Sequence, residues 1–149
     1  MLISTKGRYA TRMLLDIATH QRDGYVPMKD VAQRQQISKK YMETFTAHLS
    51  SAGILGIKRG KEGGYRLLVA PGEVTLLDIL RSVEDSLHAV ACLECKPNRC
   101  PRAPYCISLP AWEGLDRVVQ EYLSSVTLQT LIDQAPAQPE TLPDTPCGS

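Results

Sequence analysis

Four cysteines lie close together in the second half of the chain: Cys92, Cys95, Cys100 and Cys106. Thiolates are the protein ligands that soft metals and iron–sulfur clusters select. A few buried or disulfide-bonded cysteines would be the alternative. Because four in one short, polar, proline-rich segment do not all fit a hydrophobic core, the segment predicts a soft-metal or iron–sulfur site.

Whether these thiols are reduced or form disulfides depends on the cellular compartment of the protein. No apolar run reaches the roughly 18 residues of a membrane span, and residues 1–20 show charge and an amphipathic period rather than a signal peptide. We therefore expect a cytoplasmic protein with no membrane partner. Thiols stay reduced in the cytosol, which favours a metal site over disulfides. The fifth cysteine, Cys147, lies in the tail and is expected to have no role.

Charge is divided unevenly along the 149 residues, although the formal net charge is only +1. Residues 1–66 contain twelve Lys or Arg and five Asp or Glu. Residues 67–149 contain five Lys or Arg and eleven Asp or Glu. A basic first half predicts that this half meets a polyanion. Ordinary solvated surface charge is the alternative that charge alone leaves open.

The first half has the element order of a winged helix-turn-helix. Its predicted elements are helices over 4–20, from 28 onward and over 38–52, then strands over 54–59 and 65–69. Ser38 is expected to cap the third helix, and Gly53 to end it. The strands flank a glycine-rich tip over 60–64, which predicts a hairpin. Helix, helix, turn, helix and hairpin is the winged order.

The second half is predicted to join this module to a long helix. Its expected elements are a helix begun by Thr75, a cysteine loop over 89–105, a helix over 107–124 and a short one over 127–132. We predict three parts: residues 1–70 as the DNA-binding module, 71–134 as connecting helix, cluster loop and dimerisation helix, and 135–149 as a disordered tail. The fold class is mainly α with a small β-hairpin wing.

Candidate DNA contacts lie on three of these elements. A helix fits the major groove, where its N-terminal residues meet base edges. A wing arginine can enter a narrow minor groove, and we favour Arg59 for that role. Side chains at the start of the first helix can position the protein on phosphates. The candidates are Ser4, Thr5, Lys6, Tyr9, Ser38, Lys39, Lys40, Glu43, Arg59 and Lys61. A solvated, purely structural helix face is the alternative.

Several stretches together resemble the IscR/NsrR/RirA family of bacterial winged-helix regulators. The matching segments are 4–10 (STKGRYA), 37–43 (ISKKYME), 59–65 (RGKEGGY), 100–102 (CPR), Cys106, Trp112 and 126–128 (VTL). The resemblance covers about residues 1–134. It implies a homodimer in which helix 107–124 crosses its twin, and an iron–sulfur cluster, [2Fe-2S] or [4Fe-4S], in the loop before that helix. We expect the stripe Trp112, Leu115, Val119 and Tyr122 to form the dimer interface.

The family pattern has three cysteine ligands, and Cys100 and Cys106 match the last two. The first is Cys92 or Cys95; we favour Cys92, because its spacing resembles RirA-like members. Neither usual fourth ligand is present: Leu109 stands where IscR-type members have histidine, and Arg8 where NsrR-like members have an acidic residue. Cys95, a solvent molecule or a small molecule is left for the fourth position, and His88 is a weak further candidate.

Nothing in the chain forms a nucleophile–base–acid arrangement, so we predict no enzyme and no small-molecule substrate. The favoured function is a dimeric transcription regulator, such as a repressor, that binds a double-stranded DNA operator under control of the cluster. One alternative keeps the DNA function but makes the cysteines a thiol sensor or a zinc site. The other is a metal-loaded module that binds protein instead of DNA.

Overall fold

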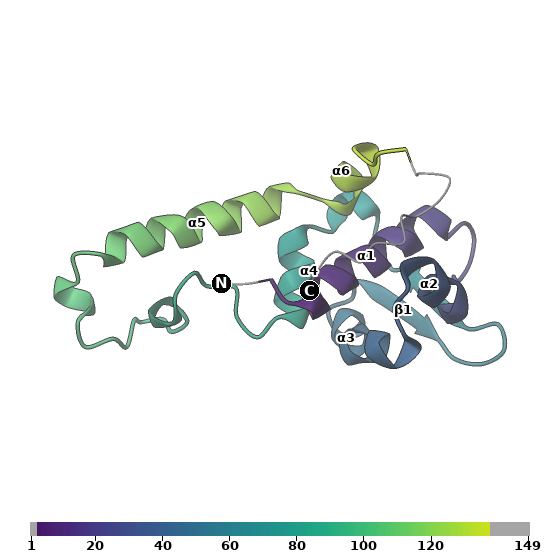
Figure 1. The fold of residues 1–149 in the computed structure, drawn as a ribbon, viewed down its shortest axis with the longest axis horizontal. Helices are drawn as coiled ribbons and strands as arrows, with labels where there is room; N and C mark the ends of the chain where they lie inside the picture. Colours follow the sequence, from purple (N-terminus) through teal and green to yellow (C-terminus); the bar gives the residue numbers. More distant parts are fainter. Residues whose placement is uncertain (1–2, 138–149) are drawn as a thin grey trace.

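The computed structural model describes residues 3–137, which fold into a winged body from which one long helix extends as an arm (Figure 1). The helices are α1 (Thr5–His20), α2 (Met28–Gln35), α3 (Lys39–Ser51), α4 (Leu76–Val83), α5 (Leu109–Ser125) and α6 (Leu128–Asp133). The strands are β1 (Leu55–Lys58) and β2 (Gly64–Leu67). Short 3₁₀ turns are η1 (Pro71–Glu73), η2 (Ala91–Leu93) and η3 (Ala103–Tyr105).

The winged body is built on one hydrophobic core. Each of α1 and α3 buries residues spaced three or four apart, so their apolar stripes face inward. The stripe of α1 is Met13, Leu14 and Ile17, and that of α3 is Met42, Phe45 and Leu49. Strand residues and α4 complete the core from the remaining sides. This packing fixes which faces of α3 and the wing look outward.

The turns around α3 have the expected chemistry. Gln36, which follows α2, adopts a left-handed conformation with φ of 54° and lets the chain turn sharply into α3. After α3, Gly53 has a φ of +75°, and its N–H bonds to the carbonyl of Ser50 while Ile54 bonds to Leu49. This is a Schellman ending, in which glycine is favoured because it has no Cβ.

The wing is tied to the helices by a backbone bridge. β1 and β2 pair antiparallel, with Leu55 opposite Leu67 and Lys58 opposite Gly64. The loop between α1 and α2 then pairs with β2: Val26 N–H donates to the carbonyl of Tyr65 at 2.7 Å, and Tyr65 N–H donates back at 2.8 Å. β2 therefore has a hydrogen-bonded neighbour on each side: β1 on one side and Val26 on the other.

α4, α5 and α6 return the chain to the winged body. Thr75 caps α4 and exchanges hydrogen bonds with Asp78 in a capping box. The residues before α4 pair with those before α6, since Leu76 N–H donates to Val126 at 2.9 Å and Leu128 N–H donates to Val74 at 3.0 Å. A second apolar cluster, Leu77, Leu80, Leu87 and Leu123, joins α4 to α5.

The predicted fold class is confirmed: the structure is mainly helical, with one two-stranded wing among the described residues. Some bounds differ. The second strand ends at Leu67 instead of residue 69, because Leu68 and Val69 turn outward. α5 begins at Leu109 instead of 107, after a turn in which Ile107 is 97% exposed. The tail prediction, and Cys147 with it, falls mainly on 138–149, outside the described residues.

Candidate nucleic-acid interface and cysteine loop

The predicted recognition helix is α3, and its outer face carries the candidate contacts. The Ser38 hydroxyl accepts the N–H of Tyr41 at 3.1 Å, which caps the helix. Because Met42, Phe45 and Leu49 face the core, the opposite side meets solvent. The exposed candidates there are Ser38, Lys39, Lys40 and Glu43. The first two turns therefore present two cations and one carboxylate to any partner.

An open groove of about 490 Å³ separates α3 from the wing. Its lining residues are Met28, Glu43, Thr46, Ala47, Ile57, Arg59, Gly60 and Tyr65. The structure thus brings together Glu43 and Arg59, which the sequence placed on separate elements. A carboxylate accepts hydrogen bonds and a guanidinium donates them, so the two rims offer complementary chemistry to base edges.

The wing tip depends on glycine and projects two basic side chains. Gly60 has a φ of +103°, and its carbonyl accepts the N–H of Gly63 at 3.1 Å. A Cβ on Gly63 would lie 2.3 Å from the carbonyl oxygen of Lys58, so the tight turn leaves no room for a side chain. Arg59 and Lys61 are both exposed at this tip.

Tyr25 is a residue of this surface that the sequence argument missed. It lies in the loop before α2, and its ring is 5.8 Å from Lys58 Nζ and 6.0 Å from Arg66 Cζ. Both cations are within the range of cation–π attraction. The ring therefore helps to position Lys58 and Arg66 on the strands of the wing. No local pattern could reveal this, because Tyr25 is far from both partners in sequence.

The candidate phosphate contacts at the start of α1 differ in exposure and in the bonds they already make within the protein. The Ser4 hydroxyl donates to Glu84 at 2.8 Å, so its one proton is already bonded within the protein. Tyr9 is half-buried and meets the ring of Tyr41 edge-on, at 5.5 Å between centroids. Thr5 is exposed and Lys6 half-exposed. The predicted phosphate contacts by Ser4, Thr5, Lys6 and Tyr9 remain predictions.

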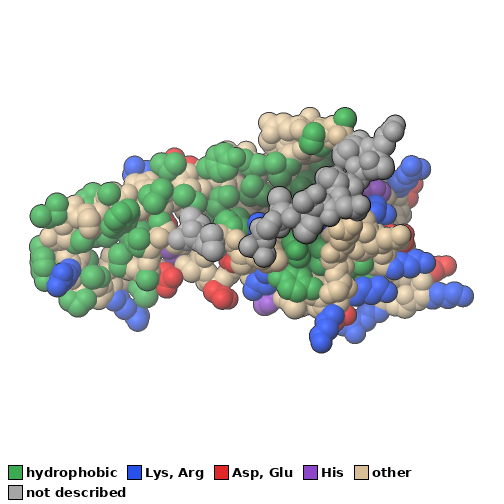
Figure 2. All heavy atoms as spheres, viewed as in Figure 1, with side chains coloured by type: hydrophobic (Ala, Val, Ile, Leu, Met, Phe, Trp, Pro, Cys, Tyr) green, Lys and Arg blue, Asp and Glu red, His purple; other side chains and the backbone are tan. Residues whose placement is uncertain are grey.

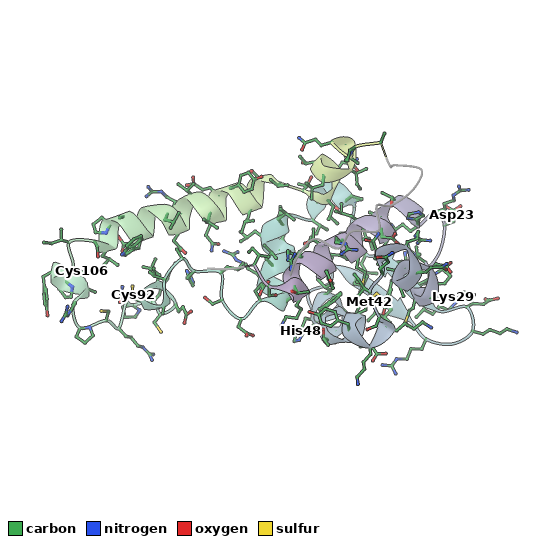
Figure 3. All side chains as sticks on the ribbon, in the orientation of Figure 1. Asp23, Lys29, Met42, His48, Cys92 and Cys106 are labelled. Carbon is green, nitrogen blue, oxygen red and sulfur yellow. The ribbon has the colours of Figure 1, made fainter. Side chains whose placement is uncertain are left out.

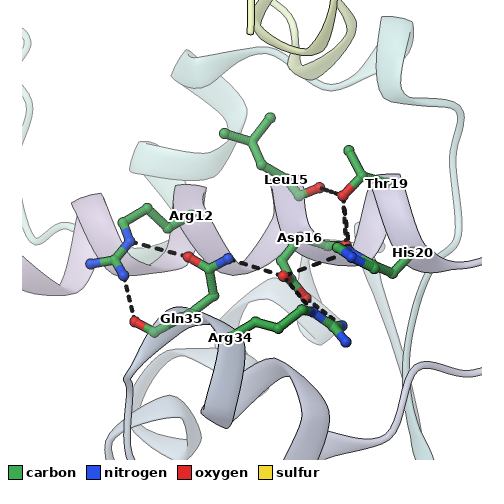
Figure 4. A network of polar contacts seen from close by, with 7 residues as sticks. All are labelled: Arg12, Leu15, Asp16, Thr19, His20, Arg34 and Gln35. Carbon is green, nitrogen blue, oxygen red and sulfur yellow. Dashed lines mark hydrogen bonds and ion pairs between the residues drawn. The ribbon is translucent and has the colours of Figure 1, made fainter. Parts of the chain in front are cut away.

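Some of the arginines in the first half make hydrogen bonds and ion pairs within the protein (Figure 4). Asp16 is 5% exposed and accepts two hydrogen bonds from Arg34, at 2.9 and 2.8 Å, and one from Gln35 at 3.0 Å. The bond to Asp16 raises the pKa of Arg34. Arg12 donates to the side chain and the backbone carbonyl of Gln35. This network joins α1 to α2, so these two arginines act in the fold.

Many of the exposed lysines and arginines lie over α2, α3 and the wing, and others lie at the far end of the arm, whereas hydrophobic side chains cover much of α5 (Figure 2). The winged body thus carries the charge that suits a polyanion, and the arm carries apolar surface.

The cysteine loop lies along the arm, away from α3 (Figure 3). Cys92 is in η2 and Cys106 directly follows η3, and both are half-buried, as is Cys100. Cys95 is exposed and lines a cavity of about 470 Å³ with Glu84 and His88. All four thiols are free. Within residues 3–137, no three His, Cys, Asp or Glu side chains are close enough together to hold a metal ion.

The thiol of Cys106 has a hydrogen-bond partner in Ser108. Its Sγ lies 3.4 Å from the hydroxyl of Ser108. This hydrogen bond is the main reason that the pKa of Cys106 is lowered, and the charge of Arg102 acts in the same direction. A lowered pKa favours the thiolate, which is the form that binds metal and reacts. Ser108 was not among the sequence candidates.

His88 is bonded to α5 in the structure. Its Nδ1 lies 3.1 Å from a carboxylate oxygen of Asp116, and the same carboxylate accepts the N–H of Ala89 at 2.9 Å. Asp116 therefore fastens the start of the cysteine loop to α5. The sequence argument missed Asp116, since its partners are distant along the chain.

One face of α5 is apolar and exposed. Leu115, Val118 and Tyr122 share this face and are 47%, 58% and 64% exposed, with Trp112 beside them at 41%. Val119 differs, because it packs on the cluster between α4 and α5. No helix within the described residues is long and apolar enough to cross a membrane.

Comparison with known proteins agrees with this architecture. The family model described as "Rrf2: Iron-dependent Transcriptional regulator" matches residues 3–134. Protein rrf2 of Nitratidesulfovibrio vulgaris is 36% identical over 140 residues, which cover 94% of this chain and 93% of that protein. The HTH-type transcriptional regulator IscR of Aliivibrio salmonicida is 33% identical over 132 residues, 89% of this chain and 77% of that protein.

Solved structures of similar fold are also transcriptional regulators. The global cysteine regulator CymR of B. subtilis has a TM-score of 0.74 and 31% identity, covering 91% of this chain and 99% of that one. IscR of T. potens has a TM-score of 0.71 and 31% identity, covering 93% and 94%. These relatives are regulators and not enzymes, as predicted. The chain belongs to the Rrf2 family of winged-helix transcriptional regulators.

Proposed function

We propose that this Rrf2-family regulator binds operator DNA as a homodimer and that an iron–sulfur cluster in the Cys92–Cys106 loop controls its affinity. The transcriptional role follows from the family. The three-part division also remains our proposal: residues 1–70 read DNA, 71–134 sense and dimerise, and 135–149 form the tail.

The groove between α3 and the wing is the observation that best supports the DNA-binding part. It places Glu43 and Arg59 on opposite rims, with Lys39 and Lys40 exposed on the adjoining turn. A helix flanked by basic residues can enter the major groove while the wing follows the backbone. Arg59 would enter the minor groove, and Lys61, at the tip, would meet phosphate.

The exposed apolar face of α5 supports the dimer. Leu115, Val118 and Tyr122 contact little of their own chain, and a two-fold partner would cover the same residues of both copies. Trp112 lies at the edge of this face. Val119 would contribute less than we expected from sequence, since part of its side chain already packs on α4.

The chemistry of the cysteine loop fits an iron–sulfur cluster. It offers four free thiols, one of them with a lowered pKa, and Asn98 in the same loop has a buried amide nitrogen without a partner. Cys92, Cys100 and Cys106 would be ligands, with Cys95 or an exogenous group in the fourth position. When bound, the cluster supplies a centre sensitive to redox state and small ligands. The loop would have to gather its thiols, so binding would order it.

A thiol-responsive regulator is the second candidate. A lowered pKa would make Cys106 a reactive thiol as well as a candidate ligand, and the similar CymR of Staphylococcus aureus has been solved in an oxidized form. In this case Cys106 and a neighbouring cysteine would change the loop by oxidation, without a metal.

Anaerobic purification with iron and sulfide counts separates the candidates. We expect stoichiometric iron and sulfide, a visible absorption band and a different affinity for duplex DNA after the metal is removed. A colourless protein with zinc, or one without metal, would contradict the cluster. The absence of salt-dependent binding to duplex DNA would favour the protein-interaction alternative.

A further inference from the structure

Asn98 has an amide whose orientation is fixed. It lies between Cys95 and Cys100, and its Oδ1 accepts the backbone N–H of Cys100 at 2.9 Å. Only the oxygen of an amide can accept this bond, so the bond sets which way the amide faces. The nitrogen therefore points away from the Cys100 backbone.

That nitrogen is enclosed and unsatisfied. Within residues 3–137, Asn98 Nδ2 is the one buried side-chain nitrogen or oxygen without a hydrogen-bond partner. The burial of this nitrogen is unusual for its position, because the neighbouring residues 94–97 and Arg99 are all exposed to water. Buried donors are nearly always paired, so an enclosed donor without an acceptor indicates an acceptor that arrives from elsewhere.

We propose that the Asn98 side-chain amide donates a hydrogen bond to a sulfur atom of the cluster, either a bridging sulfide or a ligand thiolate. This inference rests on the proposed function. Sulfur atoms of a cluster carry negative charge, and the amide is a neutral donor beside Cys100. Through Oδ1, the same side chain holds the Cys100 backbone, so Asn98 would both position one ligand and tune the cluster.

The bond predicts the direction of two changes. A donor to cluster sulfur stabilises the reduced state, which carries more negative charge, so removing it should shift the reduction potential to a more negative value. Partners of this kind also hold the metal, and their loss typically lowers metal affinity by about 10- to 100-fold. Iron release to a chelator should therefore be faster without the amide.

The sequence offers a selective probe, because Asn98 is the only asparagine in the 149 residues. Full-length protein grown with asparagine labelled with ¹⁵N at the side-chain amide would carry the label at one site. After anaerobic reconstitution and reduction, pulsed electron paramagnetic resonance should detect a hyperfine coupling to this nitrogen. No coupling in protein that holds a complete cluster would overturn the inference.

Variants give an independent measurement. Asn98→Ser keeps an oxygen that can accept the Cys100 N–H but has no amide, and Asn98→Asp keeps the shape and replaces the nitrogen by oxygen. Both should have a more negative potential and release iron about tenfold faster. Tyr105→Phe removes the hydroxyl of a residue that is 72% exposed in the same loop; this matched control should behave as wild type.

The outcomes separate this inference from the proposed function. Wild-type protein that binds no iron and sulfide would overturn both. A wild-type cluster whose potential and iron release are the same in Asn98→Ser would overturn the role of Asn98 alone. If a variant fails to bind the cluster, the labelled wild type decides, because its coupling needs no substitution.

Discussion

The carboxylate of Glu84 accepts two hydrogen bonds from Ser4, one from its backbone N–H at 2.9 Å and one from its hydroxyl at 2.8 Å. Ser4 also accepts the N–H of Gly7 at 3.1 Å and so caps α1. Glu84 directly follows α4, where the chain leaves for the cysteine loop. A Cβ on Gly7 would lie 2.2 Å from the Glu84 carboxylate. The start of α1 and the end of α4 are thus joined at one point.

Loss of this junction should destabilise the fold. We expect Glu84→Ala to lower the free energy of unfolding by about 1–3 kcal/mol, because two donors of Ser4 lose a charged acceptor and the cap of α1 weakens. Urea denaturation followed by circular dichroism measures this change. Asp85→Ala, which removes an exposed carboxylate one residue later, should have little effect. Equal stabilities of the two variants would contradict the role of Glu84.

Removal of a single base-edge or groove contact should weaken operator binding. Lys40→Ala and Arg59→Ala are each expected to cost about 1–3 kcal/mol of binding free energy while fold and dimer stay intact, since both side chains are exposed. Anisotropy titration at fixed salt is the measurement. Arg117→Ala removes the same charge from the arm and is the control. If neither winged-body variant changes the affinity, these contacts are wrongly assigned.

A charge on the exposed face of α5 should prevent dimerisation. Leu115→Asp would place an unpaired carboxylate in the proposed interface and should give monomers or aggregates in light scattering at micromolar concentration. Val119→Asp is less informative, because Val119 also packs within its own chain. Arg117→Asp puts the same side chain on another face of the helix and should leave a dimer. Monomeric wild type at this concentration would rule out the interface.

Single cysteine variants should divide into three groups after anaerobic reconstitution. Cys92→Ala, Cys100→Ala and Cys106→Ala should lose the cluster, because thiolates are its donors. Cys95→Ala should have an altered or labile cluster if Cys95 is the fourth ligand, and a near-normal one if that position is open. Cys147→Ala should behave as wild type.

Iron and sulfide per chain is the measurement for each variant. Full occupancy in Cys100→Ala or Cys106→Ala would refute the site. A cluster that survives in Cys92→Ala but is lost in Cys95→Ala would mean that Cys95 is the first ligand.

Stability should fall at high pH in a way that depends on Tyr65. Burial raises the pKa of Tyr65 in the fold, although its hydrogen bond with Thr46 acts in the opposite direction. The folded state therefore keeps the proton longer than the unfolded chain, whose tyrosines titrate near pH 10. The contribution is complete below about pH 10 and is lost as pH rises toward the folded pKa.

Tyr65→Phe tests this dependence. At neutral pH it should cost about 1 kcal/mol, since Thr46 loses its partner. Above about pH 10 the variant should lose less stability than wild type, because it has no proton to release on unfolding. Tyr105→Phe, at a position that is 72% exposed, should follow the wild-type profile. Parallel pH profiles for wild type and Tyr65→Phe in urea denaturation would contradict the argument.

Local signals in the sequence predicted most of the fold. Ser38, Gly53 and Thr75 have capping chemistry that acts within a few residues, so helix bounds came within one or two positions. The apolar spacing in α3 indicated Tyr41, Phe45 and Leu49 as its inward stripe, and Met42 was missed although it is fully buried. A periodic pattern identifies the apolar side of a helix, but not how wide the buried sector becomes after packing.

Contacts between distant segments could not be predicted in the same way. The bridge between Val26 and Tyr65 and the bond from Ala89 to Asp116 depend on how elements meet in space. The stripe on α5 shows the same limit: Leu115 and Val119 have equal apolar character, yet one is exposed and the other packs on α4. Spacing alone does not state which neighbour covers a side chain.

The short length of α4 has a mechanical consequence. Residues 85–125, which comprise the cysteine loop and α5, begin after Glu84 at one end of this eight-residue helix. The chain returns at Val126, whose carbonyl accepts the N–H of Leu76 at the other end. The two attachment points are therefore only about 12 Å apart. α4 also contacts both α1 and α3. α1 and α3 both carry candidate DNA contacts, so we expect a displacement of residues 85–125 to reach both helices through α4.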